Sequence, residues 1–186
     1  DDDGKKYMLL NRGARIFQLS SDCSEKIGEA SLLWLGVCRK NPEGPRVMKK
    51  DGYYYLFLAE GGTGMGHRVT VARSKTLYGP YEPCPHNPIV RQNDESQLLQ
   101  CCGHGMVVDT PEGDWYIAYL TLRRSKDGYG FTGRETCIDP LVWDKDGWPL
   151  VNGGKGPGVF SRIPKKTKST KEYPDAEYYP AWKGTL

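Results

Sequence analysis

The chain has 186 residues, and its 26 lysine and arginine residues against 23 carboxylates give a formal net charge of +3. This length suits roughly one domain, and the 38% hydrophobic and 26% charged fractions exclude disordered and fibrous proteins. No apolar run approaches the ~18 residues of a membrane span, and so weak a charge gives no reason to expect a nucleic-acid or membrane partner.

A tight turn followed by a strand recurs along the chain. Asp and Glu before Gly favour the positive φ of a tight hairpin turn, and an aromatic or β-branched run after it favours a strand. The turns are Asp3-Gly4, Asp51-Gly52, Glu112-Gly113 and, more weakly, Asp146-Gly147. Further strands are predicted over residues 14–19, 31–35, 44–49, 68–74, 105–109 and 138–143.

These hairpins favour an all-β fold and, within it, a β-propeller. They recur at a loose period of roughly 40 to 50 residues with several short strands per unit, and no segment shows a sustained helical period of apolar residues. A β-sandwich, which also spaces its hairpins regularly, is the alternative. Four hairpins are too few to close a ring, and the chain opens at Asp1 without an initiator Met. We therefore expect an upstream part to be missing.

The composition changes near the end of the chain. We expect a partial propeller over residues 1–160 and a Lys/Tyr/Pro-rich linker or tail over 161–186, because the basic run at 165–171 contains no aromatic residues. The six cysteines show no CxxC spacing, and the adjacent Cys101 and Cys102 suit a disulfide framework poorly. Buried free thiols are therefore expected.

Two of the three histidines lie in glycine-rich loops, at Gly66-His67 and Gly103-His104-Gly105. Glycines permit close backbone approach, and such loops often line functional sites. A purely structural histidine is the alternative in each case, and His86 is expected in a surface loop. The run from Glu60 to His67 lacks the order of a phosphate-binding loop, which predicts a tight loop at a strand end.

Glu43 is the carboxylate best placed for acid catalysis. It lies in Asn41-Pro42-Glu43-Gly44-Pro45, where two prolines fix the backbone and the glycine lets a ligand come close. A general acid needs such rigid placement. Glu60 and Glu135, each at a strand end, are the competing carboxylates, and a turn or ion-pair role is the alternative for Glu43.

An ordered set of motifs resembles glycoside hydrolase family 43, the β-xylosidases and α-L-arabinofuranosidases. The resemblance covers about residues 1–160. The motifs are Asn-Pro-Glu-Gly-Pro at 41–45, Lys-Lys-Asp-Gly-Tyr-Tyr-Tyr-Leu at 49–56, Ala-Glu-Gly-Gly-Thr at 59–63, Gly-His at 66–67, Val-Ala-Arg-Ser at 71–74, Gly-Pro-Tyr-Glu at 79–82, Gly-His-Gly at 103–105, Gly-Arg-Glu-Thr at 133–136 and Val-Trp-Asp to Gly-Trp-Pro at 142–149.

The resemblance implies a five-bladed β-propeller, of which this chain covers roughly the later three to four blades. It also implies an inverting acid/base mechanism that requires no cofactor, in which one carboxylic acid protonates the leaving oxygen and a carboxylate activates water. It assigns the general acid to Glu43 and a sugar- and carboxylate-binding guanidinium to Arg134. His104 would organise the site and in some members helps to hold calcium. Glu60, Thr63 and His67 would line the sugar site.

The chain also departs from the family pattern. The general base and the Asp that tunes the general acid precede the first turn in this family, so we expect both to be missing here and do not assign them to Asp1, Asp2 or Asp3. Arg46 stands where the family usually has His, and Met106 where an acidic residue is common. Many relatives carry a C-terminal β-sandwich, which is a candidate for the segment beyond the linker.

The sequence thus predicts a glycosidase acting on xylan- or arabinoxylan-type saccharides. The choice between β-xylosidase and α-L-arabinofuranosidase stays open, and so does the cellular compartment. The alternative is a propeller that binds sugars through its tyrosines and tryptophans without cleaving them.

Overall fold

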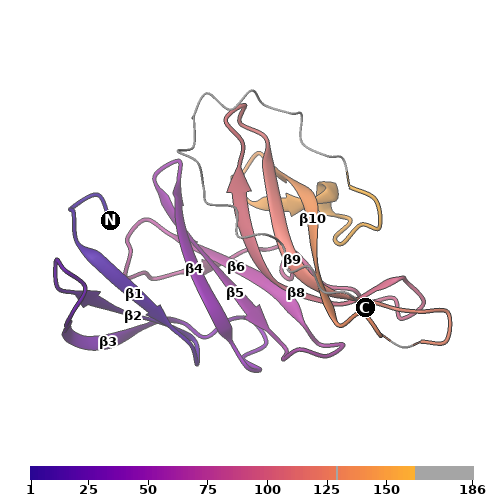
Figure 1. The fold of residues 1–186 in the computed structure, drawn as a ribbon. Coiled ribbons are helices and arrows are strands. Elements are labelled where there is room, and N and C mark those ends of the chain that lie inside the picture. The colour runs from indigo at the N-terminus through magenta and orange to yellow at the C-terminus, as the bar shows by residue number, and fades with distance from the viewer. Residues whose placement is uncertain (129, 162–186) are drawn as a thin grey trace, which may run out of the picture.

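The computed structural model describes residues 1–128 and 130–161, which form three antiparallel sheets lying side by side (Figure 1). The all-β prediction is confirmed, because the only helix among these residues is a single 3₁₀ turn at Asn152–Gly154. No helix in this part of the chain is long and apolar enough to cross a membrane. The predicted tail lies outside the described residues, except for Ser161.

The first sheet contains β1 (Lys6–Leu10), β2 (Ala14–Leu19) and β3 (Lys26–Trp34), in that order. The prediction for β2 is confirmed to the residue. β3 begins five residues before the predicted start at Ser31. The prediction missed this part of the strand because residues 26–29 are exposed and carry no apolar pattern that would mark a strand. Pairing with β2 holds this segment extended, with two register shifts along the ladder.

The second sheet has the order β4 (Glu43–Lys50), β5 (Tyr53–Glu60), β6 (Arg68–Ser74) and β7 (Glu82–Pro83). Asp51 and Gly52 form the predicted tight turn with φ of 49° and 74°, and the flanking residues pair across it. Both faces of β5 are buried. This explains why its sequence reads as a continuous apolar run without alternation.

The third sheet has the order β8 (Leu99–Asp109), β9 (Trp115–Arg123), β10 (Arg134–Trp143) and β11 (Pro149–Val151). The turns at Glu112-Gly113 and Asp146-Gly147 join its strands, as predicted, and the weak fourth hairpin yields only the short β11. The repeated hairpins are therefore confirmed. They produce three separate sheets and not one continuous layer.

The edge strands β4 and β8 of the second and third sheets are irregular where the candidate residues lie. β4 changes register between Glu43 and Arg46, and β8 changes register twice between Gln100 and Met106. Bulges of this kind bend a strand and redirect its side chains, and they are frequent next to active sites.

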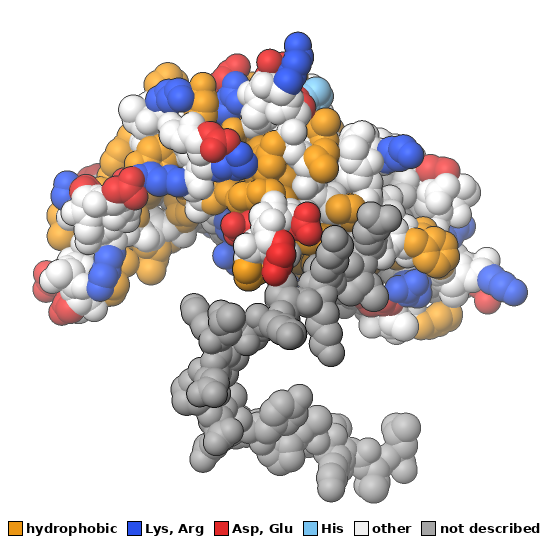
Figure 2. Space-filling model, turned by 90° about the horizontal axis from the view of Figure 1, so that it is seen from above, with side chains coloured by type: hydrophobic (Ala, Val, Ile, Leu, Met, Phe, Trp, Pro, Cys, Tyr) orange, Lys and Arg blue, Asp and Glu red, His pale blue; other side chains and the backbone are white. Residues whose placement is uncertain are grey.

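Two hydrophobic clusters hold the sheets together through the two faces of β5. Tyr55 and Phe57 belong to the larger cluster between the second and third sheets, whereas Leu56 and Leu58 pack against the first sheet. Seen from above, hydrophobic side chains gather across the upper middle of the molecule, with charged side chains scattered around them (Figure 2). The middle sheet is thus the element on which both neighbours pack.

All six cysteines are free thiols, as predicted. The expectation that they are buried holds for Cys84 and Cys102, but it is wrong for Cys23 and Cys38, which are exposed. Both exposed cysteines lie outside the strands, one in the β2–β3 turn and one in the segment between the first two sheets. His86 is exposed as predicted, and its Nε2 lies 2.8 Å from a carboxylate oxygen of Asp144.

A cation–aromatic stack joins the second and third sheets at the edge formed by the hairpin turns. The Arg73 guanidinium lies 3.9 Å from the ring centre of Trp148 and 4.5 Å from that of Tyr53, and its Nη1 donates a 2.5 Å hydrogen bond to the Asp146 carbonyl. The Tyr55 hydroxyl donates to the Gly147 carbonyl at 2.5 Å. Side chains from β5 and β6 of the second sheet thus bind the turn at Asp146-Gly147 in the third sheet.

We predict that Arg73→Ala lowers the free energy of unfolding by about 2 kcal/mol, because a partly buried cation–π contact and a hydrogen bond between sheets are lost together. Lys75 is the matched control, since it is exposed and its Nζ lies 3.4 Å from the ring centre of the same Tyr53. Urea unfolding should show a much smaller loss for Lys75→Ala. Equal losses would contradict the structural role of the stack.

Candidate active site

Glu43 stands at the first position of β4, half-buried, on a backbone fixed from both sides. Pro42 and Pro45 restrict the chain, and Gly44 adopts the left-handed region at φ 56°. The Gly44 N–H donates to Oδ1 of Asn11, in the β1–β2 turn, at 3.3 Å. The rigid placement expected of this carboxylate stays a prediction, supported by the hydrogen-bonded backbone at Gly44.

Gly44 also explains how His104 reaches Glu43. A Cβ atom at position 44 would lie 2.7 Å from Nε2 of His104, which is closer than side chains pack. The imidazole therefore lies directly against the backbone next to the acid. Any larger residue at 44 would displace the histidine.

The glycines around His104 serve a similar purpose in β8. A Cβ on Gly103 would lie 2.4 Å from Cδ2 of His67, and one on Gly105 would lie 2.8 Å from Ile117. His104 itself adopts φ 53°, which is unusual outside glycine and marks local strain. The prediction that Gly-His-Gly allows close backbone approach is confirmed.

Three predicted site residues from three segments converge. Side-chain ligand atoms of Glu43, His67 and His104 all lie within 4.8 Å of one another, although they come from β4, from the loop before β6, and from β8. Nδ1 of His67 lies 2.9 Å from the Cys101 carbonyl, so the neutral ring carries its proton there. Its Nε2 is buried and has no hydrogen-bond partner among the described residues.

The surroundings of His67 disfavour its charged form. Burial is the main cause that lowers the pKa of His67, and the neighbouring His104 and Arg134 act in the same direction. The bond to the Cys101 carbonyl and the charge of Glu43 oppose them. The interaction with Arg134 shows that this side chain, at the start of β10, is close enough to act on the same cluster.

The two other carboxylates considered with Glu43 are both engaged. Glu135 accepts from the guanidinium of Arg123 at 2.9 Å and from Thr132 at 2.8 Å, and these bonds lower its pKa. Arg134, its neighbour, has no ion pair within the described residues and is exposed. Glu135 is thus committed to a surface pair, while Arg134 remains available to a ligand.

Glu60 is the most heavily bonded side chain near the site. It is 1% exposed, and its carboxylate accepts backbone N–H groups of Val37, Cys38 and Arg39 at 2.9 Å each, together with the hydroxyl of Thr70 at 2.5 Å. These bonds hold the segment between β3 and β4, which leads into Glu43. That Glu60 lines the sugar site stays a prediction. Its observed contacts are those of an anchor.

Thr63 is exposed in the loop between β5 and β6. This loop is closed tightly, since a Cβ on Gly61 would lie 1.9 Å from the Gly66 carbonyl oxygen and His67 N–H donates to the Gly64 carbonyl at 2.9 Å. The predicted tight loop is confirmed. A substrate contact by Thr63 stays a prediction.

The convergent side chains fit calcium poorly. Calcium prefers six to eight oxygen ligands, whereas Glu43, His67 and His104 offer one carboxylate and two imidazoles. Among the described residues, no second Asp or Glu joins Glu43 in this cluster. The cluster places one carboxyl group beside two imidazoles.

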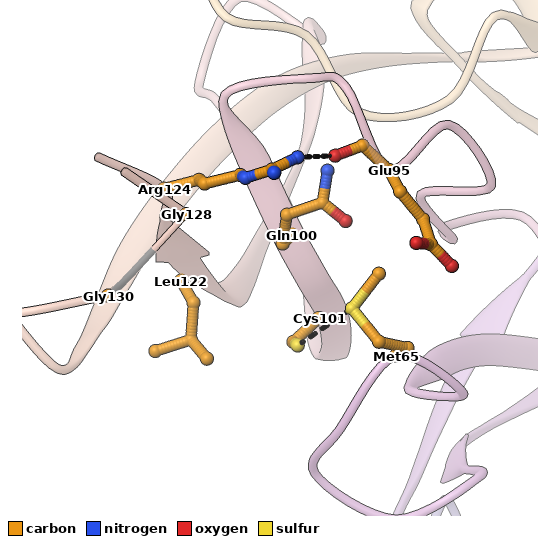
Figure 3. Close-up of a pocket in the computed structure, with 8 residues that line it drawn as sticks. All are labelled: Met65, Glu95, Gln100, Cys101, Leu122, Arg124, Gly128 and Gly130. Carbon is orange, nitrogen blue, oxygen red and sulfur yellow. Dashed lines mark hydrogen bonds between the residues drawn. The ribbon is translucent and has the colours of Figure 1, made fainter. Parts of the chain in front are cut away.

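Two cavities flank the cluster. One of about 340 Å³, shown in Figure 3, is lined by Met65, Gln100, Cys101, Leu122 and Arg124 with neighbouring backbone. The Cys101 and Met65 sulfurs are 3.8 Å apart at its lower edge, and the Arg124 guanidinium donates to the Glu95 carbonyl across the top.

The second cavity, of about 570 Å³, has Glu43 in its wall. Sequence reasoning missed four polar residues that line it: Asn11, Arg12, Arg39 and Asn41. Two features of the sequence could have pointed to these residues. Asn11-Arg12-Gly13 forms a turn between two predicted strands, and residues 39–41 directly precede the Pro-Glu-Gly-Pro motif.

Comparisons with known proteins place the chain. The family model for glycosyl hydrolases family 43 matches residues 1–149. The xylan 1,3-beta-xylosidase of a Vibrio species is 38% identical over 188 residues, covering 88% of this chain and 35% of that protein. The non-reducing end alpha-L-arabinofuranosidase BoGH43B of Bacteroides ovatus is 39% identical over 153 residues, covering 80% and 29%.

The solved structure of the GH43 BlXynB protein from Bacillus licheniformis superposes with a TM-score of 0.86 at 49% identity, covering 89% of this chain and 32% of that one. The chain therefore belongs to glycosyl hydrolases family 43, and its three sheets are blades of a β-propeller. It spans about a third of the length of the curated relatives that it matches.

We predict that Glu60→Gln loosens the segment that leads to Glu43. The amide NH₂ cannot accept hydrogen bonds, so at least one of the N–H groups of residues 37–39 loses its partner in the interior, at a cost of about 2–3 kcal/mol. Hydrogen exchange at these amides should accelerate, whereas Glu112→Gln, in an exposed turn, should leave it unchanged. Unaltered exchange in the Glu60 variant would contradict the anchor role.

We also predict a pH effect at His67. Because its pKa is lowered on folding, its contribution to stability is complete above the unfolded value of about 6.5 and is lost as pH falls through the folded pKa. NMR titration should give a midpoint for His67 below 6.5. Urea unfolding should show that the stability difference between the wild type and His67→Asn shrinks on acidification, and a constant difference would refute the prediction.

Proposed function

We propose that the native polypeptide containing these residues is a glycoside hydrolase of xylan- or arabinoxylan-type saccharides, with β-xylosidase or α-L-arabinofuranosidase activity. Membership of family 43 supports this, as do the activities named for the relatives from Vibrio and Bacteroides ovatus. The observation that carries the proposal is the convergence of Glu43, His67 and His104. A sugar-binding propeller without catalysis would not need a carboxyl group held so rigidly.

In this proposal Glu43 is the general acid of an inverting reaction, and it donates its proton to the glycosidic oxygen as the bond to the sugar breaks. His104 packs against the backbone at Gly44 and orients the acid from one side, while His67 stays neutral beside it. Arg134 offers a planar fork for sugar hydroxyls or for a catalytic carboxylate. Thr63 lines the same edge. No cofactor is required for this acid/base chemistry.

The general base in this proposal comes from outside residues 1–186. An inverting enzyme needs its second carboxylate roughly 6.5–9.5 Å from the acid. Asp1 and Asp2 contact Lys49, six residues along β4 from Glu43, and an extended strand of that length spans about 20 Å. These aspartates therefore lie at the opposite end of the blades from the acid.

We further propose that the complete catalytic domain is a five-bladed propeller to which this chain contributes three blades within residues 1–160. Residues 161–186 would then form a linker or tail, with a β-sandwich as the candidate domain on its C-terminal side. The further blades and the C-terminal domain would add surfaces to the site that the three described sheets do not provide.

We predict that Glu43→Gln lowers kcat/KM for an unactivated xylo-oligosaccharide or arabinoxylan fragment by about 10²–10⁴-fold in the native polypeptide, because the leaving oxygen loses its proton donor. The loss should be much smaller for a dinitrophenyl glycoside, whose leaving group needs no proton. Glu25→Gln, in an exposed turn, is the matched control. Activity within a few fold of the wild type on the unactivated substrate would contradict the assignment, and glycan binding without turnover in the wild type would favour the sugar-binding alternative.

A further inference from the structure

The cavity that contains Glu43 is positively charged. Its lining consists of Asn11, Arg12, Leu35, Arg39, Asn41, Pro42 and Glu43, so the general acid is the only carboxylate in its wall. Neither arginine forms an ion pair with a carboxylate of the described residues. At a volume of about 570 Å³ the cavity falls within the usual range of small-ligand sites.

Geometry assigns this cavity to one side of the scissile bond, an argument that rests on the proposed function. A general acid must come within hydrogen-bond reach of the oxygen that leaves. Because Glu43 forms part of the wall, one of the two groups joined by that oxygen enters the cavity or its mouth. The residues proposed to contact the cleaved sugar, His104 and Arg134, do not line this cavity, so we assign it to the leaving group.

The backbone at both arginines adopts an unusual conformation. Arg12, Arg39 and Asn41 adopt φ of 64°, 56° and 48°, an unusual concentration of left-handed residues around one cavity. Such strain persists only where surrounding contacts fix it, and it gathers at functional sites.

The contacts that fix these residues are present on both sides of the cavity. Gly13 N–H donates to the Pro42 carbonyl at 3.3 Å, which ties the turn of Arg12 to the segment that holds Glu43. Glu60 accepts the N–H of Arg39, and Gly61 N–H donates to the Lys40 carbonyl at 2.7 Å. These bonds fix the backbone from which the two exposed arginine side chains extend.

We propose that this cavity selects a leaving group that carries a carboxylate, such as a xylose unit substituted with a uronic acid. Guanidinium groups bind carboxylates through paired charge-assisted hydrogen bonds, which are about twice as strong as neutral ones. Once Glu43 is protonated for its role as acid, the cavity wall carries two positive charges and no negative one. An acidic substituent then neutralises a charge that a neutral sugar leaves unbalanced.

The test uses the native polypeptide and two aryl glycosides of the sugar that it cleaves best, one with a 4-carboxyphenyl and one with a neutral 4-carbamoylphenyl leaving group. The measured quantity is the ratio of kcat/KM for the charged glycoside to that for the neutral one. We expect Arg12→Gln and Arg39→Gln each to lower this ratio by roughly tenfold, the effect of one lost charge-assisted contact. Lys40→Gln removes an equal charge from the same segment without touching the cavity and should change the ratio less than twofold.

A second measurement needs no variant. Raising ionic strength should lower the wild-type ratio, because salt screens the attraction of the exposed guanidinium groups for the carboxylate. A ratio that neither salt nor either arginine substitution changes would overturn the assignment of the cavity, while hydrolysis of the neutral glycoside would leave the proposed function standing. If the native polypeptide hydrolyses neither glycoside, the proposed function and this inference both fall.

Discussion

The site depends on one buried carboxylate, that of Glu60, which forms no ion pair with any residue that the structure describes. Glu60 is 1% exposed, and its carboxylate accepts hydrogen bonds from three backbone N–H groups and a hydroxyl. A buried charge is tolerable only when it is bonded in this way. The N–H groups belong to the segment that crosses from the first blade to the second and ends at Glu43. The fully hydrogen-bonded carboxylate of Glu60 therefore fixes the position of the half-buried carboxylate of Glu43.

Irregular backbone also positions the site residues. The strands β4 and β8 bulge where they carry Glu43 and His104, and small residues let one strand lie against the other. Gly44 and Gly103 are required because an imidazole occupies the space that a Cβ would need. Strain and close packing thus bring together side chains from three segments, which is how a scaffold of repeated hairpins acquires a specific site.

Much of the fold could be predicted because hairpin signals are local. An Asp-Gly turn and the apolar run after it are enough to place β5, and the prediction for β6 is confirmed to the residue. The early part of β3 could not be predicted, since pairing with β2 and not burial holds it extended. Glu43, His67 and His104 stood out through their glycine and proline neighbours. The anchoring by Glu60 and the shared cavity of Arg12 and Arg39 could not be predicted, because both arise only when distant loops fold against each other.

In the proposed reaction, Glu43 delivers a proton to a leaving group bound between Arg12 and Arg39. A crystal structure of the native polypeptide with a non-hydrolysable, sulfur-linked substrate analogue tests it most directly. We expect the linking sulfur within hydrogen-bond reach of the Glu43 carboxyl group and the leaving-group sugar in the cavity lined by the two arginines. A leaving-group sugar in the cavity of Met65 and Cys101, with the sulfur out of reach of Glu43, would contradict it.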